Sequence, residues 1–155
     1  LEFKEERVSS SRVRQALGDG DFDLAEGLLG RPYFIMGRVV YGRQLGRQLG
    51  VPTANVRLQR YRAALEGVYS VSVEGLADQA VRGIANIGIR PTVGGKEPLL
   101  EVHLFDFSKD IYGRLISVTF HKKIREEQQF GSIEELKNQI QRDIKLSRDW
   151  FSKDD

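Results

Sequence analysis

Three short segments of this 155-residue chain alternate between apolar and polar residues. In residues 68–74, Tyr69, Val71 and Val73 share one face, while two serines and a glutamate share the other. Residues 100–105 and 116–121 repeat this period of two. Because successive side chains of a strand point to opposite faces, the pattern predicts half-buried antiparallel strands. Residues 34–41 and 81–87 are less regular strand candidates, and Gly-rich turns separate the predicted strands. Several short strands of this kind predict a small barrel or sandwich, and a barrel has the advantage that it leaves no strand edge exposed.

Both ends of the chain are predicted to be helical. Residues 1–30 contain three serines at 9–11 that can cap a helix, and Gly18 and Gly30 are expected helix stops. Near the other end, Ser132 and Glu135 form a capping-box pattern. Apolar residues then recur at spacings of three and four, which predicts a helix packed on the barrel: Ile133, Leu136, Ile140 and Ile144, with Trp150 and Phe151 closing the stripe.

Composition excludes several classes of function. The chain has no cysteine, which rules out disulfides, thiolate metal sites and cysteine nucleophiles. No apolar run approaches the roughly 20 residues that span a bilayer, and no signal-peptide pattern occurs. The lack of cysteine permits a reducing compartment without proving one. A net charge of +2 does not favour nucleic acid. Residues 37–65, however, contain six arginines and no acidic residue, which indicates either an anionic ligand or a solvated basic face.

Three glycines spaced by four residues follow the first predicted strand. Gly42, Gly46 and Gly50 allow tight turns whose N–H groups can cradle phosphate oxygens, with Arg43 and Arg47 adding charge. A flexible hairpin loop is the alternative interpretation of the same spacing.

The next residues form the stiff turn Pro52-Thr53-Ala54-Asn55. Proline fixes its own φ and keeps the preceding residue extended, so the Thr53 hydroxyl and the Asn55 amide are expected on one side of the chain. Thr and Asn oxygens are hard ligands that suit Mg²⁺ together with phosphate oxygens. A side-chain turn that caps the next strand is the alternative.

Further candidates lie in the later strands. Glu101 occupies the polar phase of its strand and is either solvent-facing or a base able to accept a proton from an alcohol. Asn86 belongs to a Gly-rich transition from strand to loop at 83–95 and can face a ligand, with Gly94-Gly95 interpreted as a mobile flap. Arg125 can reach an anion or stack on a ring. His103 and His121 are interpreted as sheet-surface residues, since no zinc-site pattern is present.

These segments together resemble the riboflavin kinase module of bacterial bifunctional FAD synthetases over residues 31–151. The matching pieces, in order, are Gly37-Arg38-Val39-Val40, Leu45-Gly46-Arg47, Leu49-Gly50-Val51-Pro52-Thr53-Ala54-Asn55-Val56, Gly67-Val68-Tyr69, Ala85-Asn86-Ile87-Gly88, Arg90-Pro91-Thr92-Val93, Glu101-Val102-His103-Leu104-Phe105-Asp106-Phe107, Tyr112-Gly113, and Ile124-Arg125 with Glu127 and Phe130. Two positions depart from the family pattern: Tyr41 replaces an expected His, and Ile89 replaces a small polar residue.

The resemblance implies a mainly β fold, a six-stranded antiparallel Greek-key barrel with a C-terminal helix and a short helical N-terminal leader. It implies the reaction ATP + riboflavin → ADP + FMN with Mg²⁺, cytoplasmic and without nucleic acid or membrane partners. Residues 31–155 would be the kinase domain. Residues 1–30 would come from the end of an adenylyltransferase half to which the module is normally fused, so FMN adenylylation is not expected from this chain.

The same resemblance implies roles for individual residues. Thr53 and Asn55 would bind Mg²⁺ and ATP, and Glu101 would be the catalytic base. The flavin would contact Asn55, Glu101 and Arg125. The phosphates would be covered by the glycine segment, through Gly42, Gly46, Arg47 and Gly50. Two rivals stay open: an oligonucleotide-binding barrel, and a flavin-binding module without catalysis.

Overall fold

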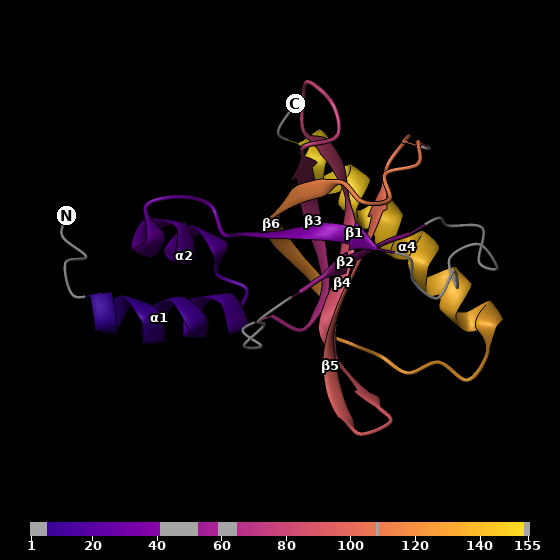
Figure 1. Ribbon diagram of the computed structural model, residues 1–155, viewed down its shortest axis with the longest axis horizontal. Helices are drawn as coiled ribbons and strands as arrows, with labels where there is room; N and C mark the ends of the chain where they lie inside the picture. The colour runs from indigo at the N-terminus through magenta and orange to yellow at the C-terminus, as the bar shows by residue number, and fades with distance from the viewer. Residues whose placement is uncertain (1–5, 41–52, 59–64, 108, 154–155) are drawn as a thin grey trace.

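The computed structural model describes residues 6–40, 53–58, 65–107 and 109–153. Two helices, α1 (Glu6–Gly18) and α2 (Phe22–Leu29), precede six strands, and a long helix, α4 (Ile133–Ser152), follows them (Figure 1). The strands are β1 (Phe34–Val40), β2 (Ala54–Arg57), β3 (Gly67–Glu74), β4 (Val81–Thr92), β5 (Gly95–Leu104) and β6 (Leu115–Arg125). No helix in the described ranges is long and apolar enough to cross a membrane.

The six strands close into an antiparallel barrel in the order β1-β2-β5-β4-β3-β6. Strands β3, β4 and β5 are successive neighbours, and β6 returns to lie beside β3, which is the Greek-key arrangement. The predicted Greek-key barrel is therefore confirmed, and the sandwich alternative is excluded.

The predicted strand faces are also confirmed. Tyr69, Val71 and Val73 of β3 lie in the main hydrophobic core, as do the residues on the predicted inner faces of β5 and β6: Leu100, Val102 and Leu104, and Ile116, Val118 and Phe120. The ring of Tyr69 packs edge-on against Phe120, with ring centroids 5.5 Å apart. Burying alternate residues in this way fixes the register of each strand, since a one-residue slip would turn every apolar side chain outward.

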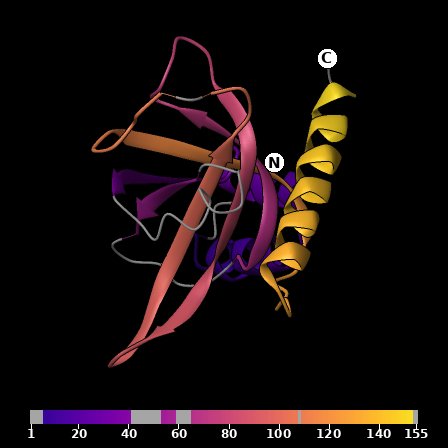
Figure 2. The same ribbon diagram turned by 90° about the vertical axis from the view of Figure 1, so that its right-hand side faces the viewer.

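One prediction about the hairpin between β4 and β5 is wrong. Residues 83–95 were expected to pass from strand to mobile flap, but β4 continues to Thr92 and pairs with β5 from Gly95 onward. Only two residues separate the strands, and Gly94 adopts φ 104°, which glycine accepts without strain. The glycines thus serve a tight turn of a long hairpin (Figure 2).

Helices α1 and α2 pack on one side of the barrel (Figure 1). Leu17 and Leu28 join the main core, and Phe22 meets the ring of Tyr69 edge-on at 5.8 Å. Gly18 ends α1 and Gly30 caps α2 in a left-handed conformation, as predicted. The expected serine cap is wrong: α1 begins at Glu6, so the serines at 9–11 lie inside the helix.

Helix α4 lies along the outside of the barrel, against β3, β4 and β6 (Figure 2). Its predicted cap is present, because Ser132 accepts a hydrogen bond from the Glu135 N–H at 3.1 Å. Phe151 forms a second apolar cluster with Val68, Ile84 and Phe105. Ile133 was expected in the apolar stripe but is 55% exposed, whereas Leu136, Ile140 and Ile144 are half-buried.

Candidate functional site

Three polar side chains from neighbouring strands form one row on the outer face of the barrel. Asn55 of β2 pairs directly with Glu101 of β5, which pairs on its other side with Asn86 of β4. Directly opposed residues place their side chains on the same face of a sheet. The next residues along these strands, Val56, Val102 and Ile87, belong to the core, so the row points outward. The sequence separated these residues widely, and the barrel brings them together.

The row continues around the barrel towards Arg125. Asn86 pairs with Val68 of β3, and Val68 pairs with Arg125 of β6, next to an irregularity in the register. With strands spaced about 4.8 Å apart, Glu101 and Arg125 are separated by roughly 14 Å along the sheet. We call Asn55, Glu101, Asn86 and Arg125 the polar row. Three of the predicted site residues therefore share one line on the barrel surface.

Asn86 carries an unusual feature within the row. Its side-chain oxygen Oδ1 is buried and, of the buried side-chain nitrogen and oxygen atoms in the described residues, it is the one without a hydrogen-bond partner. Leaving a buried acceptor unsatisfied costs about 1–3 kcal/mol. Such a cost is typical of a place where a ligand supplies the missing donor. The sequence marked Asn86 only as a ligand-facing possibility, because burial of its amide depends on tertiary packing.

Thr53 and the end of β1 adjoin the same row. Thr53 is exposed and immediately precedes β2, two residues before Asn55. Asn55 also pairs with Val40, the last residue of β1. Val40 and Thr53, the described residues on either side of the glycine segment, therefore both lie beside the row. The predicted phosphate-covering residues Gly42, Gly46, Arg47 and Gly50, and the departure at Tyr41, lie outside the described residues.

Arg125 fastens the end of β6 to α4. Its Nε donates to both carboxylate oxygens of Asp143 at 3.0 Å, and its Nη2 lies 2.9 Å from Oδ2. Gln139 donates a further hydrogen bond to Asp143, which is only 1% exposed. The Arg125 guanidinium also lies over the ring of Phe130, 5.6 Å from its centroid. The predicted flavin contact thus has a structural partner that the sequence did not reveal.

A second carboxylate lies close to the row. One oxygen of Glu127 lies 3.1 Å from the point where a Cβ would stand on Gly88, two residues along β4 from Asn86. Although Glu127 is exposed as a residue, desolvation of its carboxyl group raises the pKa of that group. The positive charge of Arg125 lowers the pKa, and the negative charges of Glu66 and Glu101 raise it further. Two residues after Arg125 and just past the end of β6, Glu127 offered no periodic signal from which to predict this position.

The structure is thus a small closed Greek-key barrel that carries a row of polar side chains on its outer face and a helix packed beside it. The chain belongs to the riboflavin kinase family, since its residues 29–151 match the family model described as Flavokinase, riboflavin kinase. The resemblance predicted from the sequence is confirmed.

Three individual proteins are similar to this chain, and two of them are described as riboflavin kinases. A protein from Pseudomonas fluorescens, described as a bifunctional riboflavin kinase/FMN adenylyltransferase, is 57% identical over 92% of this chain and 46% of its own length. The riboflavin kinase structure from Trypanosoma brucei has a TM-score of 0.53 at 25% identity, covering 79% of this chain and 81% of that one. A structure from Streptococcus pneumoniae, described as a macrolide-efflux protein, has a TM-score of 0.81 at 40% identity, covering 91% and 46%. The chain thus spans about half the length of the curated relative.

Proposed function

We propose that this chain transfers the terminal phosphoryl group of ATP to the 5′-hydroxyl of riboflavin, giving ADP and FMN. The observation that carries the proposal is the direct pairing of Glu101 with Asn55 and Asn86 on the barrel of a riboflavin kinase family member. Phosphoryl transfer depends mainly on positioning and on neutralising oxygen charge. A fixed carboxylate between two amides, next to both ends of the glycine segment, supports that kind of chemistry.

Glu101 is the base of the proposed reaction. The ribityl oxygen forms a bond to the γ-phosphorus, the bond from that phosphorus to the bridging oxygen breaks, and ADP leaves with the electron pair. The hydroxyl proton passes to the Glu101 carboxylate. Because Glu101 lies mid-strand between two paired neighbours, its backbone is held on both sides, which keeps the carboxylate directed at one place.

Asn55 and Thr53 are the proposed ligands for Mg²⁺. Both offer neutral, hard oxygens, and Mg²⁺ typically keeps several waters and takes phosphate oxygens as its remaining ligands. In the described ranges no three His, Asp or Glu side chains gather in a metal-binding group, so such an ion would depend on phosphate oxygens. When bound, it would neutralise charge on the transferring phosphoryl group. Coverage of the phosphates by Gly42, Gly46, Arg47 and Gly50 stays a prediction.

The flavin is proposed to lie along the polar row, between Glu101 and the helix side of the barrel. Asn86 Oδ1 would accept a hydrogen bond from the ribityl chain or the ring, which would satisfy its buried oxygen. Arg125, held by Asp143, would border the ring system, and Asn55 would lie near the ribityl end.

The cytoplasmic location stays a prediction from the sequence.

The relation to the longer relatives is also a proposal. This chain would correspond to the kinase part of a bifunctional protein, because the Pseudomonas relative carries both activities in its description and is matched over 46% of its length. The leader at residues 1–30 would then connect to the adenylyltransferase part, and this chain alone would form FMN without converting it to FAD.

A direct assay tests the proposal. The purified chain is mixed with riboflavin, ATP and Mg²⁺, and FMN is separated by chromatography. Glu101→Gln keeps the shape of the side chain but removes the base, so FMN formation should fall by about 10²–10⁴-fold while riboflavin still binds. Glu97→Gln, the same change four residues earlier on β5, is the matched control and should retain activity. Absence of FMN from the unmodified chain, or full activity in Glu101→Gln, would contradict the proposal.

A further inference from the structure

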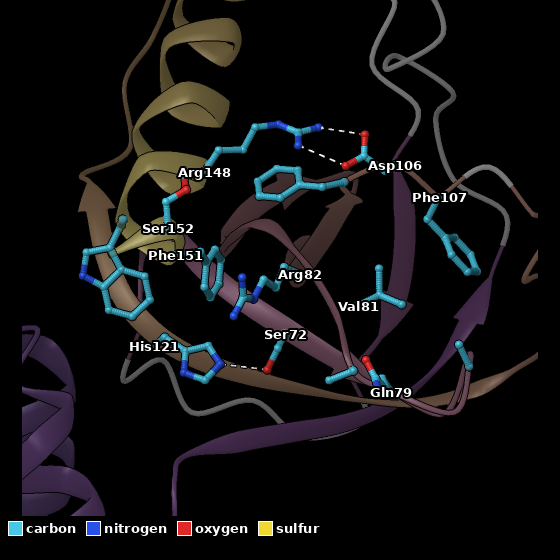
Figure 3. A pocket seen from close by; sticks show the side chains of 14 residues that line it. Ser72, Gln79, Val81, Arg82, Asp106, Phe107, His121, Arg148, Phe151 and Ser152 are labelled. Atoms are coloured by element: carbon cyan, nitrogen blue, oxygen red, sulfur yellow. Dashed lines mark hydrogen bonds and ion pairs between the residues drawn. The ribbon is translucent and has the colours of Figure 1, made fainter. Parts of the chain in front are cut away.

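A separate pocket of about 960 Å³ opens between the C-terminal part of α4 and the neighbouring ends of β3, β4 and β5 (Figure 3). None of the residues that line it belongs to the polar row. Arg82 of this pocket lies four residues before Asn86 on β4, roughly 13 Å along the strand. Phe151 lies eight residues beyond Asp143 on α4, roughly 12 Å along the helix. The pocket and the polar row are therefore different places on the barrel.

Two arginines give this pocket a positive character. The guanidinium of Arg82 lies over the ring of Phe151, 4.8 Å from its centroid, and in Figure 3 it occupies the middle of the pocket. Arg148 lies over Phe105 at 4.5 Å and holds Asp106 through two hydrogen bonds at the rim. With two arginines and one aspartate, the carboxylate and guanidinium groups of the lining sum to one net positive charge. Guanidinium groups in this setting favour phosphate or carboxylate ligands.

Aromatic rings form the wall opposite the rim. Trp150 lies beside the His121 ring, with centroids 6.2 Å apart and planes tilted by 36°, and it meets Phe151 edge-on at 5.1 Å. A 2.7 Å hydrogen bond between His121 Nε2 and the Ser72 hydroxyl fixes the imidazole (Figure 3). Rings held in this way offer surfaces against which another planar ring can pack. His121, predicted only as a sheet-surface residue, is thus part of a built cluster.

We propose that this pocket binds a phosphate monoester carried on a planar ring, at a site separate from the polar row. Its volume lies within the 300–1,000 Å³ range that is typical of small-molecule sites, at the upper end that suits a mononucleotide. The ring packs against the wall of Trp150 and Phe151, and the phosphate meets the guanidinium edge of Arg82. An adenine nucleotide and a flavin phosphate share this chemistry. The inference does not depend on the proposed reaction.

The chain offers a direct probe of this pocket, because Trp150 is its single tryptophan. AMP is titrated into the protein while Trp150 fluorescence is followed. Adenosine, which lacks the phosphate, and inorganic phosphate, which lacks the ring, are titrated in the same way for comparison. A saturable change is expected with AMP, and binding at least about ten-fold weaker with adenosine or phosphate, because each loses one set of contacts. FMN is titrated by calorimetry with excess riboflavin present, so that the polar row is already occupied; this distinguishes a flavin phosphate from an adenine nucleotide.

Variants assign the binding to the pocket. Arg82→Met keeps an unbranched side chain against Phe151 but removes the charge, and should weaken the tighter phosphate ligand at least about ten-fold without changing FMN formation. Arg148→Met is a second variant with the same expected direction. Arg142→Met, an exposed arginine of α4 that bonds to Gln139, is the matched control and should bind normally. Folding of each variant is checked by circular dichroism.

Three outcomes would overturn the proposal. The first is the absence of saturable binding of both AMP and FMN to the unmodified chain. The second is unchanged affinity in a folded Arg82→Met or Arg148→Met variant. The third is loss of AMP binding, either when riboflavin is added or in the Glu101→Gln variant. Such a loss would show that AMP binds at the polar row and not in this pocket.

Discussion

Two helical layers pack on opposite sides of the barrel (Figure 1). Both make apolar contacts with it, and α4 adds buried polar pairs. On the side of α1 and α2 the contacts are apolar, with Leu17, Ala25 and Leu28 continuing the main core. On the α4 side polar pairs cross the interface. Ser147 hydrogen-bonds Ser70 at 2.8 Å, and Asp143 binds Arg125. Of the described residues, the buried polar ones are Ser70, Asp143 and Ser147, and all three lie between α4 and the barrel.

This difference concerns geometry more than strength. Apolar contacts are non-directional, so they stabilise α1 and α2 without demanding one rotation about the helix axis. Hydrogen bonds and ion pairs work only over narrow distances and angles, so Asp143 and Ser147 fix how α4 is rotated and how far it is shifted along the barrel. Because Arg125 belongs both to this contact and to the polar row, the position of α4 determines the shape of the proposed flavin site.

The largest effect is expected where the apolar side is broken. Leu17 is 1% exposed, so Leu17→Ala leaves a cavity and should lower the free energy of unfolding by about 3–4 kcal/mol. Leu17 belongs to the main core and not to the polar row, so riboflavin affinity and FMN formation per folded molecule should not change. Urea unfolding measures the stability and a flavin-binding titration measures the affinity. A weaker flavin affinity in the folded variant would contradict the division between the two sides.

Breaking the polar side should give a different result. Asp143→Ala removes the partner of Arg125 and should lower the free energy of unfolding by about 3 kcal/mol. The loss is limited to this value because the Arg125 side chain is 16% exposed and can be solvated by water once its partner is removed. Unlike Leu17→Ala, it should also raise the KM for riboflavin, because Arg125 is no longer held in place. The measurements are urea unfolding and initial rates. Asp149→Ala, which removes an exposed α4 carboxylate bonded to Lys145, is the matched control. A pure loss of stability with unchanged KM would remove the link between α4 and the flavin site.

The comparison also explains what the sequence could predict. The period of two assigned the inner faces of β3, β5 and β6, because the barrel core imposes that period directly. It placed Glu101 in the polar phase but could not distinguish it from Ser70, which is in the polar phase of β3 and completely buried. Whether an outward-facing residue is covered depends on where α4 lies, and that is a tertiary contact with no local period. The pairing of Asn55, Glu101 and Asn86 likewise follows from strand order.

A smaller effect tests the directional bond alone. Ser147→Ala removes one hydroxyl from a fully buried pair and leaves Ser70 without that partner, which should cost about 1–2 kcal/mol. Ser70→Ala should cost a similar amount. The double variant should cost less than the sum of the two single changes, because no buried hydroxyl is then left unpaired. Urea unfolding of the four proteins gives this coupling, and strictly additive costs would show that the two hydroxyls do not stabilise each other.

The smallest effect concerns the carboxylate beside the row. Folding raises the pKa of Glu127 above 4.5, so the native state holds this proton more tightly than the unfolded chain. Its contribution to stability is therefore lost as the pH rises from the unfolded pKa through the native one. The Glu127→Gln variant has no carboxyl to ionise at this position. Across this pH range its melting temperature should therefore rise relative to that of the unmodified chain, and at higher pH the difference between the two should stay constant. Glu74→Gln makes the same change at an exposed position at the end of β3. If both variants follow the same pH curve, the Glu127 carboxyl is neither desolvated nor affected by the charges of Glu66 and Glu101, and it is not a second carboxylate beside the row.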